Sequence, residues 1–322
     1  LTPRTLDLLE QSGVTEGLLA AANRIRRIEV VDGRARRLLT LRLERLRHPF
    51  PFWLVVPQSE TERLLTIALA ELGIEIEWNT ELMDIMWFGE RVEAVVANEA
   101  ASETVEPSVL IGADGAHSTV RDLSRIGFEG TSYPAVFALA DIRYAFPRDA
   151  GVATLEVFPG GAVATVPIDE YTLRHAGTSG DIVELVKNRR SAAEILWHST
   201  LQVNLRNVAS LQRGKAFLAG DAAHGHAPIG SRALNLGIED AAWLAHMVEN
   251  GSEKDYTAVR LPVARKVVRQ SRAEADRLMQ HNMLPPSLWR TLVRSALYLP
   301  FAEQLALQRL SGLDTPRPPW LA

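Results

Sequence analysis

The chain of 322 residues contains no cysteine, and this absence excludes several classes of protein. Without thiols the chain holds no disulfide, no cysteine-ligated zinc, no iron–sulfur cluster and no thiolate nucleophile. Long apolar runs are also lacking, because no stretch approaches the roughly 18 residues of a membrane-spanning helix. Positive charge is not in excess: 35 lysines and arginines stand against 39 aspartates and glutamates, a net charge of −4. We therefore expect neither nucleic-acid binding nor integral membrane association.

The residues that are present have an ordinary globular composition: 47% are hydrophobic, 23% charged and 7% aromatic. A chain of this length buries about three quarters of its unfolded surface and is expected to form about two domains. The first residue is a leucine, and no signal-peptide pattern follows it. The default expectation is therefore a cytoplasmic location.

The pattern of apolar residues predicts an α/β domain that is interrupted by a β-rich domain. Two short helices separated at Gly13 are predicted over residues 2–22, and a helix ending at Gly73 over 59–72. A hairpin with a tight Asp32-Gly33 turn is predicted over residues 28–43. Further strands are predicted at residues 53–56, 74–78, 92–96 and 105–112. Short alternating segments from about 131 to 208 predict a mostly antiparallel sheet, and a long helix is predicted over 255–280.

Two strings of residues suggest chemistry. In the first, residues 109–121, an apolar strand ends in Gly112-Ala113-Asp114-Gly115, and Ser118 is predicted to cap the next helix. In the second, residues 216–241, an apolar strand ends in Gly220-Asp221, and a loop leads to a helix beginning near Ala233. Ligands of α/β sheets collect at the carboxyl ends of strands, where helix N-termini favour anions.

Each of these features also has a simpler interpretation. Taken alone, Asp114 fits an ordinary turn, and Asp221 fits a helix cap. His224 and His226 could suggest a metal pair, but no third ligand stands at a recognisable spacing. We therefore expect no metal site and interpret the two histidines as structural residues of the loop.

Taken together, the two strings resemble the DG and GD motifs of FAD-dependent aromatic hydroxylases of the para-hydroxybenzoate hydroxylase type. The resemblance extends over nearly the whole chain and includes Pro57-Gln58 and Tyr256…Arg260…Pro262. It implies an α/β fold with an incomplete Rossmann-like FAD-binding domain, interrupted by a mostly antiparallel β-sheet substrate domain and followed by C-terminal helices. The implied boundaries are 1–30, 54–127 and 209–270 for the FAD-binding domain, 31–53 and 128–208 for the β-rich domain, and 271–322 for the C-terminal helical region.

The resemblance also implies a role for matching residues. Asp221, which follows Gly220, would accept hydrogen bonds from the ribityl chain of FAD. Asp114, with Gly115, would lie near the pyrophosphate or the ribitol and would influence the handling of the nicotinamide. Gln58 would contact the linker region of the flavin.

Three further implied contacts concern the region around the flavin ring. Arg4 is expected near the cofactor, and Pro228 against the isoalloxazine. A set of backbone amides would face the N1–C2=O edge of the ring, namely those of Gly230, Ser231, Arg232, Ala233, Leu234 and Asn235. Reduced flavin is negatively charged at this edge, and a helix N-terminus supplies a complementary partial positive charge.

The sequence departs from the family pattern in two places. Ser231 and Ala233 stand where the family has loop glycines, and the methyl group of Ala233 lies where the backbone usually approaches the ring. No two glycines are separated by a single residue, so the G-x-G-x-x-G fingerprint is absent. We therefore expect that a βαβ unit of roughly 30 residues or more is missing from the front, and that this chain alone holds FAD weakly.

The implied function is that of an FAD-dependent monooxygenase that hydroxylates an aromatic or similar electron-rich small molecule with NAD(P)H and O2. The substrate is expected against the sheet of residues 128–208. No catalytic residue is assigned: His175 and Tyr171 are conceivable bases, but ordinary sheet surface describes them better. The alternatives are a related flavin oxidoreductase, such as a halogenase or a reductase, and a degenerate flavoprotein without activity. The characteristic lysine and Trp-x-Trp-x-x-Ile features of halogenases are not seen.

Overall fold

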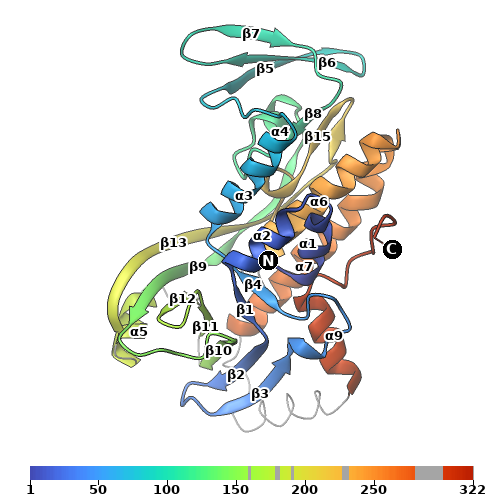
Figure 1. The fold of residues 1–322 in the computed structure, drawn as a ribbon. Coiled ribbons are helices and arrows are strands. Elements are labelled where there is room, and N and C mark those ends of the chain that lie inside the picture. Colours follow the sequence, from blue (N-terminus) through green and yellow to red (C-terminus); the bar gives the residue numbers. More distant parts are fainter. Residues whose placement is uncertain (159–160, 178–181, 190–191, 227–231, 280–299, 322) are drawn as a thin grey trace. The chain divides into compact units, whose positions relative to one another are not determined.

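The computed structural model describes residues 1–158, 161–177, 182–189, 192–226, 232–279 and 300–321 (Figure 1). The chain divides into two compact units: unit 1 is Leu1–Ala68, Pro134–Val203 and Ala273–Ala322, and unit 2 is Leu69–Tyr133 and Asn204–Arg272. The chain passes between them within four elements, namely α3 (Gln58–Glu71), β9 (Phe128–Tyr144), β13 (Ala192–Val208) and α7 (Tyr256–Met279). The division into FAD-binding, β-rich and C-terminal regions stays a prediction.

Unit 1 begins with two short helices, α1 (Pro3–Glu10) and α2 (Val14–Ala21). They are separated as predicted at Gly13, whose φ of 74° is a left-handed conformation that suits glycine. The strands β1 (Asn23–Ile25) and β4 (Trp53–Val55) follow and pair antiparallel. The N-terminal part of α3 then completes this half of the unit.

The rest of unit 1 is built on a large sheet. Its strands lie in the order β13-β9-β12-β11-β10-β2-β3. From β9 to β3 the neighbouring strands pair antiparallel, except that β10 and β2 run parallel. The strands not yet introduced are β2 (Arg27–Asp32), β3 (Arg37–Arg42), β10 (Val152–Phe158), β11 (Gly161–Pro167) and β12 (Thr172–Gly177). Helix α5 (Ile182–Arg189) packs on one apolar cluster of this sheet, and Leu307 of α9 (Pro300–Leu310) belongs to another. The predicted mostly antiparallel sheet is confirmed.

Unit 2 contains two smaller sheets. One has the order β14-β15-β8, formed by β14 (Gln212–Arg213), β15 (Ala216–Leu218) and β8 (Leu110–Gly112). The other is an antiparallel meander of β5 (Glu81–Phe88), β6 (Arg91–Ala97) and β7 (Ser102–Val105). Its helices are α4 (Thr119–Leu123), α6 (Arg232–Glu249) and most of α7, and β16 (His224–Gly225) pairs with the end of β13.

The apolar core of unit 2 lies around the mixed β14-β15-β8 sheet. Phe217 and Leu218 of β15 are buried together with Val120, Leu244 and Tyr256 from the surrounding helices. None of the helices in the described part of the chain is long and apolar enough to cross a membrane.

Two of the predicted strands are wrong. Residues 74–78 form no strand, and Ile74 and Trp78 are 51% and 72% exposed. Alternation marks a segment that can pair, but a strand also needs a neighbour, and no described strand pairs with this segment. The strand predicted over residues 105–112 is divided into β7 and β8 around Pro107, which lacks the N–H that a continuous ladder requires.

Two local details also differ from the prediction. The turn between β2 and β3 is wider than an Asp-Gly pair, because Asp32 accepts the amides of Arg34 and Arg36, and Ala35 takes a left-handed φ of 57°. The helix that follows Ser118 ends at Leu123, before the predicted stop at Gly127. Both differences arise from local backbone hydrogen bonding that periodicity does not report.

Candidate functional site

The fold brings the two motif strings side by side in unit 2. Strands β8 and β15 run parallel, with Gly112 opposite Leu218. The amide of Ala219 donates to the carbonyl of Gly112 over 3.0 Å, which continues the pairing past the end of β15. Because parallel strands end at the same edge of a sheet, Asp114 and Asp221 both follow carboxyl ends at one edge, where α/β proteins bind ligands.

The side chain of Asp114 holds helix α4, which follows strand β8. One oxygen of its carboxylate accepts the amide of Val120 at 3.0 Å, and the hydroxyl of Ser118 accepts the amide of Arg121, so the predicted cap at Ser118 is confirmed. A methyl group on Gly112 would lie 2.7 Å from the Cβ of Val120, so only glycine lets α4 approach the strand this closely. Asp114 therefore stabilises the start of α4, and it is also exposed at the edge of the sheet.

Asp221 lies in a short 3-10 turn, Gly220–Ala222, at the end of β15. Its side chain is exposed, and its carboxylate has no hydrogen-bond or ion-pair partner among the described residues. Gly220 has a left-handed φ of 63°. The turn rests on helix α6, because a methyl group added to Gly237 would lie 3.2 Å from the Cα of Gly220. The turn thus presents an exposed carboxylate from a backbone that packs against α6.

We predict that Gly237→Ala weakens binding of the FAD that the family resemblance places at the Asp221 turn, because the added methyl group must displace Gly220. Helix propensity favours alanine by about 1 kcal/mol, so we expect little net loss of stability. Fluorescence titration with FAD, together with thermal unfolding, checks this. Gly127→Ala is the control, since nothing lies within 4 Å of a methyl group added there. Equal FAD affinity in the two variants would show that the turn does not depend on this contact.

A buried network of charged groups lies behind the turn. His224 Nε2 is 2.6 Å from Asp240 Oδ2, and Arg260 donates to Asp240 Oδ1 at 2.8 Å and to Glu239 Oε1 at 2.7 Å. All four side chains are 4% exposed or less. Burial alone would raise the pKa of Asp240, but Arg260 and His224 offset this and hold the pKa below its usual value.

His226 lies beside this network, with its ring centroid 5.5 Å from that of His224. Burial, assisted by the neighbouring charge of His224, lowers the pKa of His226 from 6.5 to about 3. His226 is therefore neutral at physiological pH.

The low pKa of His226 predicts a pH dependence of stability. Between pH 6.5 and pH 3 the unfolded chain binds a proton at this histidine and the folded chain does not, so stability falls as the pH is lowered. We expect this histidine to contribute a loss of about 2 kcal/mol between pH 7 and pH 5. Urea unfolding of the wild type and of His226→Gln measures it, with the exposed His117→Gln as control. Identical pH slopes in the wild type and His226→Gln would contradict the expectation.

Helix α7 supports the end of β15 directly. The hydroxyl of Tyr256 donates to the carbonyl of Leu218 at 3.1 Å, and Arg260 of the same helix reaches α6 as described. Figure 1 shows α6 and α7 beside each other. These two residues of α7 therefore contact two different elements: Tyr256 contacts the end of β15, and Arg260 contacts α6.

A family model described as an FAD binding domain matches residues 1–178 and 174–271. The chain belongs to the FAD binding domain family. The predicted resemblance to FAD-dependent aromatic hydroxylases is confirmed, and so is the α/β fold class that it implied.

Curated relatives of this FAD binding domain are monooxygenases. The 12-dehydrotetracycline 5-monooxygenase/anhydrotetracycline 6-monooxygenase of Streptomyces rimosus is 30% identical, over 98% of this chain and 68% of the relative. The 6-methylpretetramide 4-monooxygenase of Streptomyces rimosus is 29% identical, over 88% of this chain. The chain spans 56% of the length of this second relative.

Solved structures share the fold. The OxyS anhydrotetracycline hydroxylase from Streptomyces rimosus has a TM-score of 0.78 at 27% identity, covering 99% of this chain and 68% of that one. The p-nitrophenol 4-monooxygenase PnpA from Pseudomonas putida DLL-E4 has a TM-score of 0.83 at 21% identity, covering 99% and 88%. The second likeness shows the fold alone.

The residues of the FAD binding domain at the β8–β15 edge fit the cofactor that the family binds. The carboxylate of Asp221, which has no partner among the described residues, is an acceptor for hydroxyl groups. Helix α6 begins at Arg232, close to the predicted start, and the amides of Arg232, Ala233 and Leu234 lie in its first turn. The close approach of Gly220 and Gly237 leaves the turn free of bulky side chains. A ribityl chain requires an acceptor for its hydroxyl groups, and an electron-rich ring edge requires a positive partner such as a helix N-terminus. Asp221 and the first turn of α6 supply these two groups.

The remaining predicted site residues of the FAD binding domain are placed as follows. Gly115, next to Asp114, has a left-handed φ of 81°, and Asn235 in the first turn of α6 is buried. Arg4 and Gln58 belong to unit 1: Arg4 is buried in α1, where its amide donates to Ser311, and Gln58 is exposed and bonded to Glu62. Three predicted residues lie outside the described residues, namely Pro228, Gly230 and Ser231.

One interpretation of the conceivable bases was wrong. His175 is not sheet surface but is completely buried in unit 1. Its two ring nitrogens are hydrogen-bonded to the hydroxyls of Tyr144, at 3.0 Å, and Thr165, at 2.9 Å. Tyr171 is 38% exposed, as expected for surface. The buried position of His175 follows from strand pairing on both sides, which one strand's alternation does not reveal.

Sequence reasoning missed three residues that shape this site, namely Arg121, Gly237 and Asp240. Arg121 is buried and donates from Nη1 to the carbonyl of Ala222 at 3.2 Å, so it ties α4 to the Asp221 turn; its guanidinium carbon lies 4.3 Å from the centroid of the Phe128 ring. A buried arginine gives no periodic signal. A glycine within a helical pattern, as at Gly237, was the one available clue.

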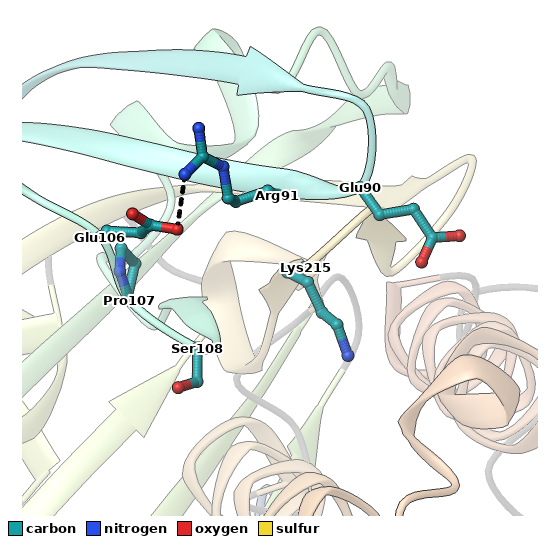
Figure 2. A pocket seen from close by; sticks show the side chains of 6 residues that line it. All are labelled: Glu90, Arg91, Glu106, Pro107, Ser108 and Lys215. Carbon is teal, nitrogen blue, oxygen red and sulfur yellow. Dashed lines mark hydrogen bonds and ion pairs between the residues drawn. The ribbon is translucent and has the colours of Figure 1, made fainter.

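A hollow on unit 2 is lined by residues that include Glu90, Glu106 and Ser108 (Figure 2). Neither Asp114 nor Asp221 is among its lining residues. Its two cationic side chains are already paired, Arg91 with Glu106 at 2.9 Å and Lys215 with Glu253 at 2.5 Å. Paired cations hold a further anion poorly, so we assign no function to this hollow.

Proposed function

We propose that the chain is the flavin-binding part of a monooxygenase that hydroxylates an aromatic or similarly electron-rich small molecule, using NAD(P)H and O2. The observation that carries this proposal is the carboxylate of Asp221, which has no partner among the described residues and follows β15, the strand paired in parallel with the β8 strand that precedes Asp114, in a chain of this family. FAD, when bound, supplies the redox chemistry and the activation of O2.

The residues of the chain bind and orient. Asp221 would accept hydrogen bonds from the ribityl hydroxyls, and Asp114 would lie toward the pyrophosphate or ribitol while it holds α4 in place. The first-turn amides from Arg232 to Asn235 would stabilise negative charge on the reduced ring. Gln58, Arg4, Pro228, Gly230 and Ser231 are proposed contacts on the family pattern.

The relatives suggest the kind of substrate to try first. Their names describe monooxygenases of fused-ring compounds, such as anhydrotetracycline, and of pentachlorophenol. We propose a phenolic or fused aromatic substrate that binds against the sheet formed by β9 to β12. Electron-rich rings of this kind are the substrates that flavin-dependent oxygen transfer requires.

The decisive experiment loads the purified chain with FAD and follows its absorbance during anaerobic addition of NADH or NADPH. NAD(P)H oxidation and O2 uptake are then measured with anhydrotetracycline, pentachlorophenol and p-nitrophenol, and products are identified by mass. At saturating FAD we expect a bound-flavin spectrum and flavin reduction. With at least one ring compound we expect a mass increase of one oxygen atom or, for pentachlorophenol, which has no ring hydrogen, release of chloride. A protein that gains no flavin spectrum at saturating FAD would refute the proposal.

A further inference from the structure

The turn that presents Asp221 is held at three points within unit 2. Gly220 rests on Gly237 of α6, and the carbonyl of Ala222 accepts a hydrogen bond from Arg121 of the α4 helix. His224, two residues after the turn, is bonded to Asp240 of α6 at 2.6 Å. These contacts lie on both sides of Asp221, whose own side chain stays exposed and unpartnered among the described residues.

Two of the three contacts meet one face of the same helix. Gly237 and Asp240 are three residues apart in α6, and residues at this spacing lie on one side of a helix. The chain from Gly220 to His224 is therefore attached to α6 at both of its ends. Its position relative to α6, and hence to the first-turn amides of that helix, depends on the His224–Asp240 bond.

The acceptor of this bond is itself fixed. Asp240 Oδ1 accepts from Arg260 of α7 at 2.8 Å, and the same guanidinium is bonded to Glu239 at 2.7 Å. A carboxylate can only accept, so Nε2 of His224 carries the proton in its contact with Asp240 Oδ2. Both groups are almost completely buried, so the bond is shielded from competing water.

We propose that His224 is a positioning residue for the flavin: through its bond to Asp240 it holds the Asp221 carboxylate in register with the N-terminus of α6. This inference rests on the proposed function, since it assumes that FAD binds at this edge. His224 touches the network behind the turn and acts on the ligand through Asp221.

Two substitutions separate the bond from the mere presence of a side chain. His224→Gln keeps an N–H donor with a reach similar to that of Nε2, and should retain FAD affinity within about threefold. His224→Leu removes the donor, and should weaken FAD binding by about tenfold or more, because the turn then loses one of its two attachments to α6. The midpoint potential and visible spectrum of the bound flavin should shift in the leucine variant and not in the glutamine variant.

The test is fluorescence titration with FAD below the unfolding transition, with circular dichroism to confirm that each variant is folded. Lys215→Met is the control, because it removes the Lys215–Glu253 ion pair at the opposite end of β15 and should lower stability without changing FAD affinity. In an Asp221→Ala background, His224→Leu should weaken binding by less than about twofold, since the group that it positions is gone.

The outcomes separate the two proposals. If the wild type binds no FAD, the proposed function fails. If the wild type binds FAD and His224→Leu keeps the wild-type affinity and midpoint potential while its melting temperature falls, the network is purely structural and the positioning role is refuted. An undiminished effect of His224→Leu in the Asp221→Ala background would also refute it.

Discussion

Arg260→Met will lower the free energy of unfolding by about 3–5 kcal/mol, the range found when one partner of a buried ion pair is removed. The side chain is completely buried between the carboxylates of Asp240 and Glu239, at 2.8 Å and 2.7 Å. Without the guanidinium two negative charges remain close together in the core of unit 2. Because the free energy of unfolding of a domain is only about 5–15 kcal/mol, this loss is a large fraction of it and should shift the unfolding transition clearly.

Urea denaturation at pH 7 measures this effect. Arg265→Met is the matched control, because Arg265 is exposed on the same helix and its removal should cost less than about 0.5 kcal/mol. The triple variant Arg260→Met, Glu239→Gln, Asp240→Asn should recover part of the loss, since it leaves no buried net charge. If Arg260→Met were as stable as Arg265→Met, the buried network would have no energetic importance.

Asp221→Ala should weaken FAD binding by at least about tenfold, and by more if several ribityl hydroxyls bond to the carboxylate. Each hydrogen bond to a charged group is worth roughly 1.5–3 kcal/mol, which corresponds to about tenfold to 150-fold in affinity. The fold should be unaffected, because the Asp221 side chain is exposed and has no partner among the described residues.

Fluorescence titration with FAD checks the prediction, and thermal unfolding confirms that the apoprotein is unchanged. Glu249→Ala is the control: it removes an exposed carboxylate at the far end of α6 and should leave FAD affinity as it is. Wild-type affinity in Asp221→Ala would remove this residue from the flavin site. An equal loss in both variants would indicate a general electrostatic effect.

The local elements of the site were predictable because their causes are local. Ser118 caps α4 through its own hydroxyl, and α6 begins within one residue of its expected start. An apolar strand that ends in Gly-Asp and leads to a helix predicts a turn with an acid at the end of the strand, whereas the exposure of Asp221 was decided by the fold. The two motif strings and the family resemblance therefore followed from the sequence.

Pairing partners were not predictable in the same way. Residues 74–78 alternate as a strand does, yet no described strand pairs with them, whereas the alternation in β12 led to a sheet in which His175 is buried. Whether an alternating segment pairs depends on neighbours distant in the sequence, and its own pattern holds no information on them.

The sequence by itself determined the kind of protein: an α/β flavoprotein with Asp114 and Asp221 each following an apolar strand. Only the tertiary structure decided what surrounds these acids. It paired β8 with β15, placed Gly237 against Gly220, and assembled His224, Asp240 and Arg260 from three separate elements. The physical reason is that a buried charge is stable only beside its partners, and those partners become neighbours only when β16, α6 and α7 pack together.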